Sequence, residues 1–226
     1  NNGNQGIAHA LNKGARKAIA LGYKWLLTMD QDSKASPSML ASMLRCYQNH
    51  SLENIGIISP YHANCFFPIS KNPKRCNEVL VTMTSGNLLN LNVFKLVGPF
   101  MESLFIDHVD TEYCLRLWDR GYRILQVNHA VLDHKVGQLK LHKLGNKTFF
   151  STNHSPVRKY YVYRNGSLVL DLYQAKFPEY CKKLRARYWV DAFIVLFYEK
   201  QKLEKFKMMF KGYLDYKRGI FGKYHD

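Results

Sequence analysis

Long apolar runs and acidic side chains are both scarce in this sequence. No stretch reaches the roughly 18 consecutive apolar residues that a membrane-spanning helix requires. The longest candidate, Ala192–Tyr198, is far shorter. The sequence begins with Asn1 and has no secretory signal, from which we expect a fragment, a processed product or an incomplete reading. The pattern therefore predicts no transmembrane helix.

Cysteine is present, but it forms no CxxC pair. The five cysteines are an odd number, and they are Cys46, Cys65, Cys76, Cys114 and Cys181. This usage favours reduced thiols in a cytosolic protein, several of them buried.

Positive charge dominates, with 33 lysines and arginines against 17 acidic residues and a formal net charge of +16. The excess is uneven, because Arg158–Asp226 alone holds 16 basic and 7 acidic side chains. A basic region of this kind suits an anionic membrane surface, a nucleic acid or a polyanionic substrate. The chain of 226 residues is also 46% hydrophobic and 14% aromatic, which predicts a substantial core and excludes a disordered chain.

Hydrophobic periodicity alternates between strand and helix up to about residue 135 and is helical after Pro156. We predict helices at residues 5–21, from a Ser36 cap followed by Pro37, at 110–120, and at about 156–174, 178–199 and 200–215. We predict strands at 23–29, 55–59, 79–83, 88–91, 122–127 and 130–134, with a surface loop over 61–77. The strand at 23–29 is apolar enough for the middle of a parallel sheet. The whole pattern predicts an α/β fold: an open sheet flanked by helices, followed by a helical C-terminal appendage.

Two carboxylates, Asp30 and Asp32, follow the predicted strand at 23–29. Ligands of open α/β sheets bind beyond the carboxyl ends of the strands. Two carboxylates one residue apart can hold a hard divalent cation, which in turn holds a diphosphate. The alternative is a cap in a solvated turn, and so short a motif also arises by chance. The position at the end of an apolar strand favours the cation site.

A second group of acids, Asp107, Asp110 and Glu112, lies at the start of the third predicted helix. The positive N-terminal end of that helix favours ionised carboxylates. Glu112 and Arg116 have the spacing of an ordinary ion pair along a helix, and we assign them that structural role. A cap explains Asp107 and Asp110 less well, because two extra acids stand beside the apolar segment Leu104–Ile106. They are candidate functional carboxylates.

His134 ends the predicted strand at 130–134 and is the best placed of the nine histidines. A histidine at a strand end can complete a metal site or donate to a phosphate, although a lone histidine is more often structural. Ser85 and Gly86 follow another predicted strand, at 79–83.

Five motifs, in this order, resemble the family 2 glycosyltransferases. They lie in Asn4–Gly14, Met29–Ser33, Thr84–Asn87, Phe105–Arg116 and Asn153–Asn165. The fifth motif, with its Tyr-Tyr-x-x-Arg-Asn ending, and the Phe-Ile-Asp-His-Val-Asp-Thr-Glu form of the fourth resemble the bacterial rhamnosyltransferase branch. The resemblance covers nearly the whole chain.

The resemblance implies a GT-A fold, with a catalytic domain over residues 1–150 and a basic helical region over 151–226. It implies that Asp30, Asp32 and His134 bind a divalent cation, Mg²⁺ or Mn²⁺, and that these three residues with Asn4 and Gly6 bind the donor diphosphate. It implies that Asp110 is the catalytic base, with Asp107 as the alternate. The resemblance further implies that Ser85, Gly86 and Asp107 bind the acceptor.

The implied reaction is transfer, with inversion, of a sugar from a nucleotide-sugar donor to a glycan or lipid-linked acceptor in cell-surface polysaccharide assembly, such as O-antigen or capsule. The expected donor is dTDP-L-rhamnose. The family begins with a β-strand and helix that bind the nucleobase, and this sequence starts after them, which puts donor affinity in question.

The C-terminal region alternates basic and aromatic residues from Tyr180 to Tyr216. It predicts either helices packed on the catalytic domain or a surface that meets anionic lipid on the inner face of a bacterial plasma membrane. Two rival functions stay open. One is a non-catalytic remnant that binds a membrane or partner; the other is a nucleic-acid binder. The sequence has no known nucleic-acid motif, and its acids would repel a phosphate backbone, so we expect no nucleic-acid partner.

Overall fold

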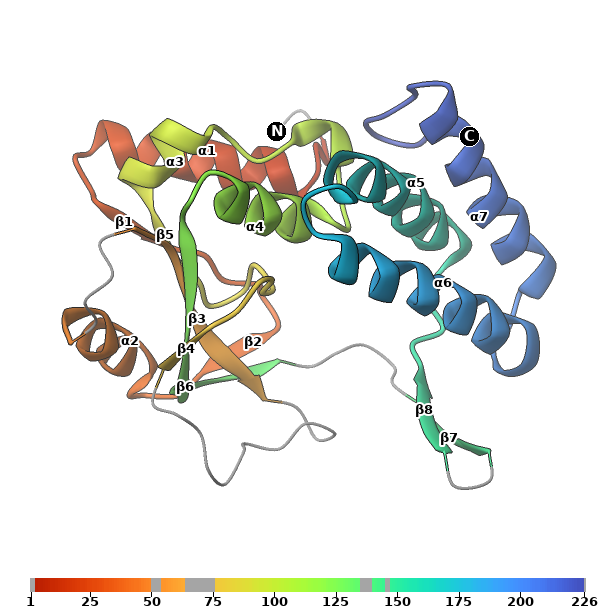
Figure 1. Ribbon diagram of the computed structural model, residues 1–226, viewed down its shortest axis with the longest axis horizontal. Coiled ribbons are helices and arrows are strands. Elements are labelled where there is room, and N and C mark those ends of the chain that lie inside the picture. The colour runs from red at the N-terminus through yellow and green to blue at the C-terminus, as the bar shows by residue number, and fades with distance from the viewer. Residues whose placement is uncertain (1–2, 50–53, 64–75, 135–139, 145–146, 226) are drawn as a thin grey trace. The chain divides into compact units, whose positions relative to one another are not determined.

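The computed structural model describes residues 3–49, 54–63, 76–134, 140–144 and 147–225 (Figure 1). The chain divides into two compact units. The first contains Asn1–Met101 and Val109–Lys135, and the second contains Glu102–His108 and Val136–Asp226. The short segment Glu102–His108 thus belongs to the helical unit, while a domain limit at residue 150 stays a prediction.

The first unit is built on a mixed sheet with the strand order β1-β5-β3-β6-β2, and β4 also pairs with β6. The strands are β1 (Trp25–Leu27), β2 (Ser33–Ala35), β3 (Ile55–Ala63), β4 (Cys76–Glu78), β5 (Leu88–Asn90) and β6 (Arg123–His134). The central pair, β3 and β6, is parallel, and the other pairs are antiparallel. The long strand β6 binds β4 near its start and β2 at its end.

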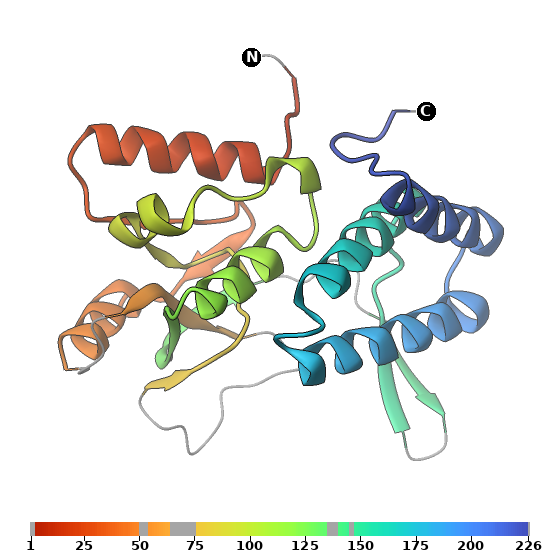
Figure 2. The ribbon, with the colours of Figure 1, turned by 45° about the horizontal axis from the view of Figure 1, so that its top comes forward.

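Four helices belong to this unit: α1 (Ile7–Ala20), α2 (Met39–Gln48), α3 (Leu91–Val97) and α4 (Val109–Asp119). Helix α2 buries Met39, Met43 and Cys46 against Ile55 and Ile58 of β3, in the main apolar cluster of the unit. Helices α1, α3 and α4 lie beside one another (Figures 1 and 2). The spacing of apolar residues in α2 therefore gives this helix one buried face.

The second unit is helical. It holds the short 3₁₀ turn η1 (Glu102–Leu104), the hairpin β7 (Lys140–Leu144) and β8 (Lys147–Ser151), and the helices α5 (Pro156–Tyr173), α6 (Pro178–Tyr198) and α7 (Lys202–Lys217). Ser155 caps α5 by accepting a hydrogen bond from the Arg158 N–H, with Pro156 at the first helical position. Helices α5 and α7 pack so closely that a Cβ on Gly212 would overlap the Tyr160 carbonyl oxygen.

The helices predicted at residues 5–21, 110–120 and beyond 156 are confirmed, and so is the mixed α/β architecture with helices at the C-terminal end. No helix within the described ranges is both long and apolar enough to cross a membrane. The two strands predicted at 122–127 and 130–134 are one strand, β6.

Three local predictions are wrong. The first strand is not central: β1 stands at one end of the strand order and pairs antiparallel with β5. The strand predicted at 79–83 lies earlier, at β4, which overlaps the end of the segment that we predicted as a surface loop. Helix α2 begins at Met39, after Ser38, so Ser36 is not its cap.

The prediction of reduced cysteines is also wrong at one pair. Cys46 of α2 and Cys76 of β4 form a disulfide, with their Cα atoms 6.7 Å apart. Sequence spacing could not indicate this pair, because α2 and β4 are brought together only by packing and pairing with β6. Cys114 and Cys181 are free and buried, as expected, and Cys65 lies outside the described residues.

Candidate functional site

The predicted cation-binding carboxylates lie on a tight turn between β1 and β2. Asp32 is exposed and Asp30 is half-buried, and the Ser33 N–H donates to the Asp30 carbonyl oxygen over 3.3 Å. Within the described residues no ion pair occupies either carboxylate. Both carboxylates are thus available at the surface of the first unit.

Ser85 holds this turn in place. Its hydroxyl accepts a hydrogen bond from the Asp30 N–H over 3.0 Å and donates to the Ser33 hydroxyl over 2.8 Å. The His62 ring lies 2.7 Å from the Ser85 carbonyl oxygen. Ser85 is only 1% exposed. The structure therefore brings Ser85 to the predicted cation site as a support for the turn, while contact with an acceptor stays a prediction.

Gly86 is required by the same loop. Its φ of +80° is left-handed, and a Cβ there would lie 2.6 Å from Pro60 Cγ and 3.0 Å from Leu132 Cδ2. Its N–H donates to the Thr28 carbonyl oxygen over 2.6 Å, which ties the loop to the end of β1. Only glycine combines this backbone conformation with so close an approach.

The backbone of His134 pairs with Ser33 in the β2–β6 ladder, so its Cα lies directly across from the turn. The position of its side chain lies outside the described part of the structure. Among the described residues no group of three or more His, Cys, Asp or Glu side chains is arranged to hold a metal ion. The donor set still fits Mg²⁺, because this ion is commonly held by one or two protein carboxylates together with phosphate oxygens and water.

Asn4 and Gly6 lie just before α1. The Asn4 side-chain oxygen accepts a hydrogen bond from the Gly6 N–H over 3.0 Å, and Gly6 precedes the first helical residue with a φ of +88°. These residues line a hollow together with His9 and Lys13. The first turn of α1 has no acidic residue, so its N-terminal end and Lys13 give this hollow a positive character.

Asp110 occupies the first turn of α4. Its Oδ1 accepts the Thr111 N–H over 2.7 Å, and the carboxylate borders a small cavity of about 10 Å³. Asn87 Oδ1 and Tyr113 Oη, two buried atoms without a partner in the described residues, belong to side chains that line the same cavity. The structure thus places Asp110 beside the Thr84–Asn87 loop.

Glu112 and Arg116 form the ion pair that their spacing predicts. Arg116 donates to both carboxylate oxygens, over 2.9 and 2.8 Å, and also to the Val97 and Pro99 carbonyl oxygens. Glu112 is only 1% exposed. The structural assignment of this pair is confirmed. Through Arg116 the pair also connects α4 to the C-terminal end of α3 and to Pro99.

Asp107 belongs to the second unit and lies in an unusual segment. Phe105, Asp107 and His108 all have left-handed backbones, with φ of 63°, 61° and 61°. Such conformations destabilise a non-glycine residue by about 1–3 kcal/mol and persist where the surroundings enforce them. Such conformations are often found at functional sites, so a role for this segment stays a prediction that its backbone is consistent with.

The surroundings that enforce this segment come from α5. Asn165 Nδ2 lies 2.8, 2.7 and 3.0 Å from the carbonyl oxygens of Leu104, Ile106 and Asp107. Arg164, which is fully buried, donates to the carbonyl oxygens of Ser103 and Leu104 as well. Arg164 and Asn165 belong to the fifth sequence motif, but their contact with the acidic segment was not predicted.

The Asp107 carboxylate is held by Arg158 of α5. The Arg158 guanidinium contacts both carboxylate oxygens over 3.1–3.3 Å. His154 lies nearby, and partial burial, followed by the Arg158 charge, lowers its pKa. Asp107 is therefore ion-paired, unlike Asp30 and Asp32.

His108 is enclosed next to Asp107. Its Nε2 lies 3.3 Å from Tyr188 Oη, which donates to the Val162 carbonyl oxygen. Burial lowers the pKa of His108 to about 4, although the Asp107 charge opposes this. A Cβ on Gly166 would lie 2.9 Å from His108 Nε2 and would overlap Tyr188 Oη. Gly166 therefore makes room for the neutral imidazole.

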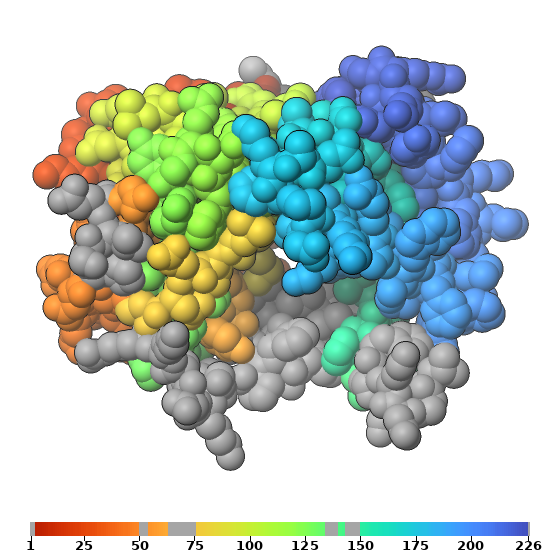
Figure 3. Space-filling model, in the orientation of Figure 1, coloured from red at the N-terminus to blue at the C-terminus, as the bar shows by residue number. Residues whose placement is uncertain are grey.

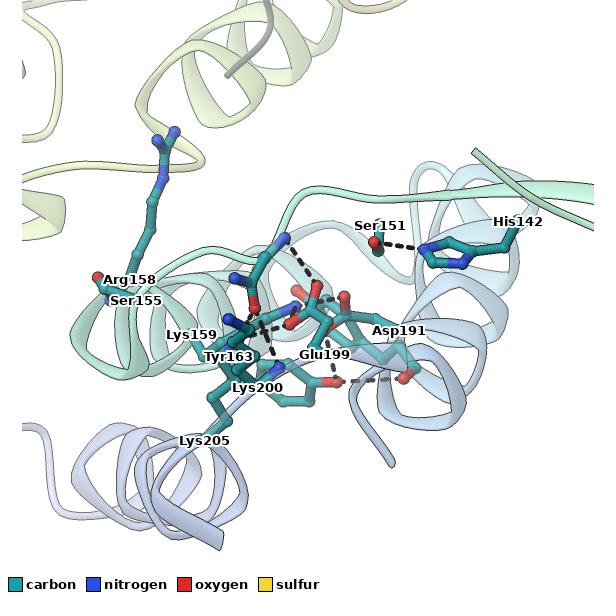
Figure 4. A network of polar contacts seen from close by, with 12 residues as sticks. His142, Ser151, Ser155, Arg158, Lys159, Tyr163, Asp191, Glu199, Lys200 and Lys205 are labelled. Carbon is teal, nitrogen blue, oxygen red and sulfur yellow. Dashed lines mark hydrogen bonds and ion pairs between the residues drawn. The ribbon is translucent and has the colours of Figure 1, made fainter. Parts of the chain in front are cut away.

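A network of charged side chains, of which Lys159, Glu199 and Lys205 are buried, joins the helices of the second unit (Figure 4). Lys159 Nζ lies 2.6 Å from Asp191 and 3.8 Å from Glu199, and Lys205 Nζ lies 2.9 Å from Glu199 and 2.7 Å from the Asn153 side-chain oxygen. Buried ammonium groups are tolerated only when paired in this way. The network links α5, α6 and α7 and gives the second unit a defined arrangement.

No family profile matches the chain. The sequence is 33% identical over 190 residues to a protein of Shigella flexneri named dTDP-rhamnosyl transferase RfbF. The match covers 74% of this chain and 60% of the length of that relative. The similarity supports a relationship to the glycosyltransferases. The mixed sheet flanked by helices is consistent with a glycosyltransferase-like fold.

Proposed function

We propose that this protein is an inverting glycosyltransferase of the GT-A type within family 2, that it moves a sugar from a nucleoside diphosphate to an acceptor hydroxyl, and that its donor is dTDP-L-rhamnose. The similarity to a protein named as a dTDP-rhamnosyl transferase is the observation that carries this proposal. The paired carboxylates on the Asp30–Ser33 turn support it, because nothing in the described residues neutralises them.

In the proposed mechanism, Asp110 is the general base. Its place in the first turn of α4 favours the ionised form. The Thr111 N–H fixes the orientation of its carboxylate. Asp110 accepts the proton of the acceptor hydroxyl as that oxygen bonds to the anomeric carbon and the bond from this carbon to the diphosphate breaks. Asp107 is the alternate base and an acceptor-binding group.

Asp30 and Asp32, with His134, would hold Mg²⁺ or Mn²⁺ beside the donor diphosphate. Such an ion supplies positive charge that stabilises the departing nucleoside diphosphate. Asn4 and Gly6 are proposed donor contacts at the positive end of α1. Ser85 and Gly86 support the turn and adjoin the proposed acceptor pocket.

The acceptor is proposed to be a glycan or a lipid-linked glycan of a bacterial cell-surface polysaccharide, reached at the inner face of the plasma membrane. One face of α6 supports this location. Trp189, Val190, Phe193, Leu196 and Phe197 are each between 42% and 79% exposed, and their spacing puts them on one side of the helix.

Exposed basic side chains precede this apolar face on α6, namely Lys182, Lys183, Arg185 and Arg187. Figure 3 shows α6 across the surface of the second unit in that view. Aromatic residues flanked by lysine and arginine suit the interface of an anionic bilayer. By contrast, Met209 is buried and Met208 packs on the Tyr160–Tyr161 cluster, so these two residues belong to the core rather than to a lipid surface.

Calorimetric titration of dTDP-L-rhamnose in Mn²⁺, repeated in EDTA, tests the proposed donor site. We expect binding that needs the metal, and we expect Asp32→Ala to weaken it by roughly 10–100-fold. Asp119→Ala is the matched control, because it removes a carboxylate at the C-terminal end of α4, outside the proposed cation site. This variant should bind the donor as the unmodified chain does. Absence of binding by a folded chain would leave the non-catalytic remnant as the better reading.

The membrane surface is tested separately, on vesicles of phosphatidylcholine with and without phosphatidylglycerol. Trp189→Ala and Phe197→Ala should reduce cosedimentation with the anionic vesicles, whereas Leu96→Ala, an exposed leucine of α3, should not. Equal binding by all three variants would reject the α6 face as the membrane surface. A retardation of DNA that salt abolishes would instead favour the nucleic-acid reading.

A further inference from the structure

We propose that Asn165 is a positioning residue, which holds the Phe105–His108 segment in its left-handed form and thereby fixes the Asp107 carboxylate for the acceptor. The part of this inference that concerns the acceptor rests on the proposed function. The part that concerns the backbone rests on the hydrogen bonds of the second unit alone.

A single side-chain amide satisfies three backbone carbonyl groups in this segment. Asn165 Nδ2 has two N–H groups, and it lies within 3.0 Å of the oxygens of Leu104, Ile106 and Asp107. The orientation of the amide is set by its other end, because Asn165 Oδ1 accepts a hydrogen bond from Arg164 Nε over 2.9 Å. Asn165 is fully buried, so water cannot take its place without rearrangement.

Arg164, which donates to the Asn165 side-chain oxygen, is itself held by several contacts. Its guanidinium lies over the rings of Tyr160, Tyr161 and Phe221, at 5.0–5.4 Å from their centroids. It also donates to the Gly222 carbonyl oxygen over 2.9 Å. Because Arg164 bonds the Leu104 carbonyl oxygen too, the arginine and the asparagine act on the same stretch of backbone.

Asp107 is then held at two points by one face of α5. Asn165 binds its carbonyl oxygen, and Arg158 binds its carboxylate. Arg158 and Asn165 are seven residues apart, which is about two helical turns, so both project from the same side of the helix. The carboxylate of Asp107 cannot turn without breaking either the ion pair or the left-handed backbone.

Hydrogen–deuterium exchange of the peptide that spans 102–110 tests the backbone part, with Asn165→Ala as the variant. We expect exchange at the Phe105 and Ile106 amides, which now donate to Glu102 and Leu104, to rise about tenfold or more as the segment opens. Asn90→Ala is the matched control, since Asn90 also makes three hydrogen bonds, one to the Ile55 carbonyl and two within its helix cap.

Transfer kinetics test the second part in the same variants. Asn165→Ala should raise the acceptor KM or lower kcat by roughly 10–100-fold, while the donor affinity stays within about twofold. Asn165→Ser, which keeps one shorter donor, should recover part of the loss. If circular dichroism shows that Asn165→Ala does not fold, Asn165→Ser replaces it as the test variant.

The outcomes separate this inference from the proposed function. Exchange in Asn165→Ala no faster than in Asn90→Ala would overturn the inference. Faster exchange in Asn165→Ala, together with no sugar transfer by the unmodified chain, would support the role of Asn165 in holding the backbone. It would reject the proposed transferase function. An equal loss of donor and acceptor affinity would assign Asn165 to general stability and reject its positioning role.

Discussion

The acids of the two units are held in opposite ways. In the first unit Asp30 and Asp32 stand on a turn that is fixed through its backbone, by the Ser85 hydroxyl, and within the described residues their carboxylates have no ion-pair partner. In the second unit the Asp107 carboxylate is ion-paired with Arg158, and its backbone is strained. Available carboxylates suit a cation, whereas a fixed carboxylate beside a guanidinium suits the hydroxyl groups of a sugar.

The largest expected effect is on the chemical step. Asp110→Asn should lower kcat by about 10³-fold, because the amide cannot accept the acceptor proton, while metal-dependent donor binding persists. Asp107→Asn is the comparison, and it should affect chiefly the acceptor KM. If Asp110→Asn keeps its turnover and Asp107→Asn loses it, the base is Asp107.

Gly166→Ala should destabilise the second unit by about 3 kcal/mol of unfolding free energy, since the new methyl group overlaps Tyr188 Oη and crowds His108. Urea denaturation measures this. Gly14→Ala in α1 is the control, because its Cβ would meet only Leu26 Cδ2 at 3.8 Å. A stable Gly166→Ala protein would contradict the close packing of α5 on α6.

The pH dependence of stability should reveal the buried His108. Its folded pKa of about 4 lies below the ordinary value of 6.5, so the unfolded chain binds more protons between these values. Its contribution to stability is therefore complete above pH 6.5 and is lost as the pH falls towards 4. We expect a loss of about 2 kcal/mol between pH 7 and pH 5.

His108→Asn checks this assignment, because asparagine tolerates a left-handed backbone and does not titrate. The variant should show a shallower fall in unfolding free energy over the same pH range. The groups that face His108 are Asp107, Arg187 and Tyr188, and His154 titrates separately under the influence of Arg158. An unchanged slope would assign the pH dependence to His154 instead.

Ser85→Ala should have the smallest effect on stability, about 1–2 kcal/mol, because it removes two hydrogen bonds from the Asp30–Ser33 turn. The loss should appear more strongly in metal-dependent donor binding than in thermal stability. Ser167→Ala, which removes a hydroxyl bonded to the Tyr163 carbonyl of α5, is the control. Equal donor binding by both variants would separate Ser85 from the cation site.

Part of this organisation could be predicted from local patterns. The stripe of small residues in α1, the Pro156 start of α5 and the four-residue spacing of Glu112 and Arg116 depend on neighbours along one helix. The position of β1 could not be predicted, because an apolar strand reads the same whether its partners are parallel or antiparallel. The helix α3 and the hairpin β7–β8 were missed, since both are short and have weak periodicity.

The sequence by itself determined the mixed α/β class, the C-terminal helices, the basic charge and the set of candidate acids, because these depend on composition and on spacing within single elements. Only the tertiary structure decided that Arg158 pairs with Asp107, how Ser85 supports the turn, and that Asn165 and Arg164 bind the segment around Asp107. These contacts join residues more than 50 positions apart in the chain. Local propensity carries no information about such partners, which are set by how the elements pack.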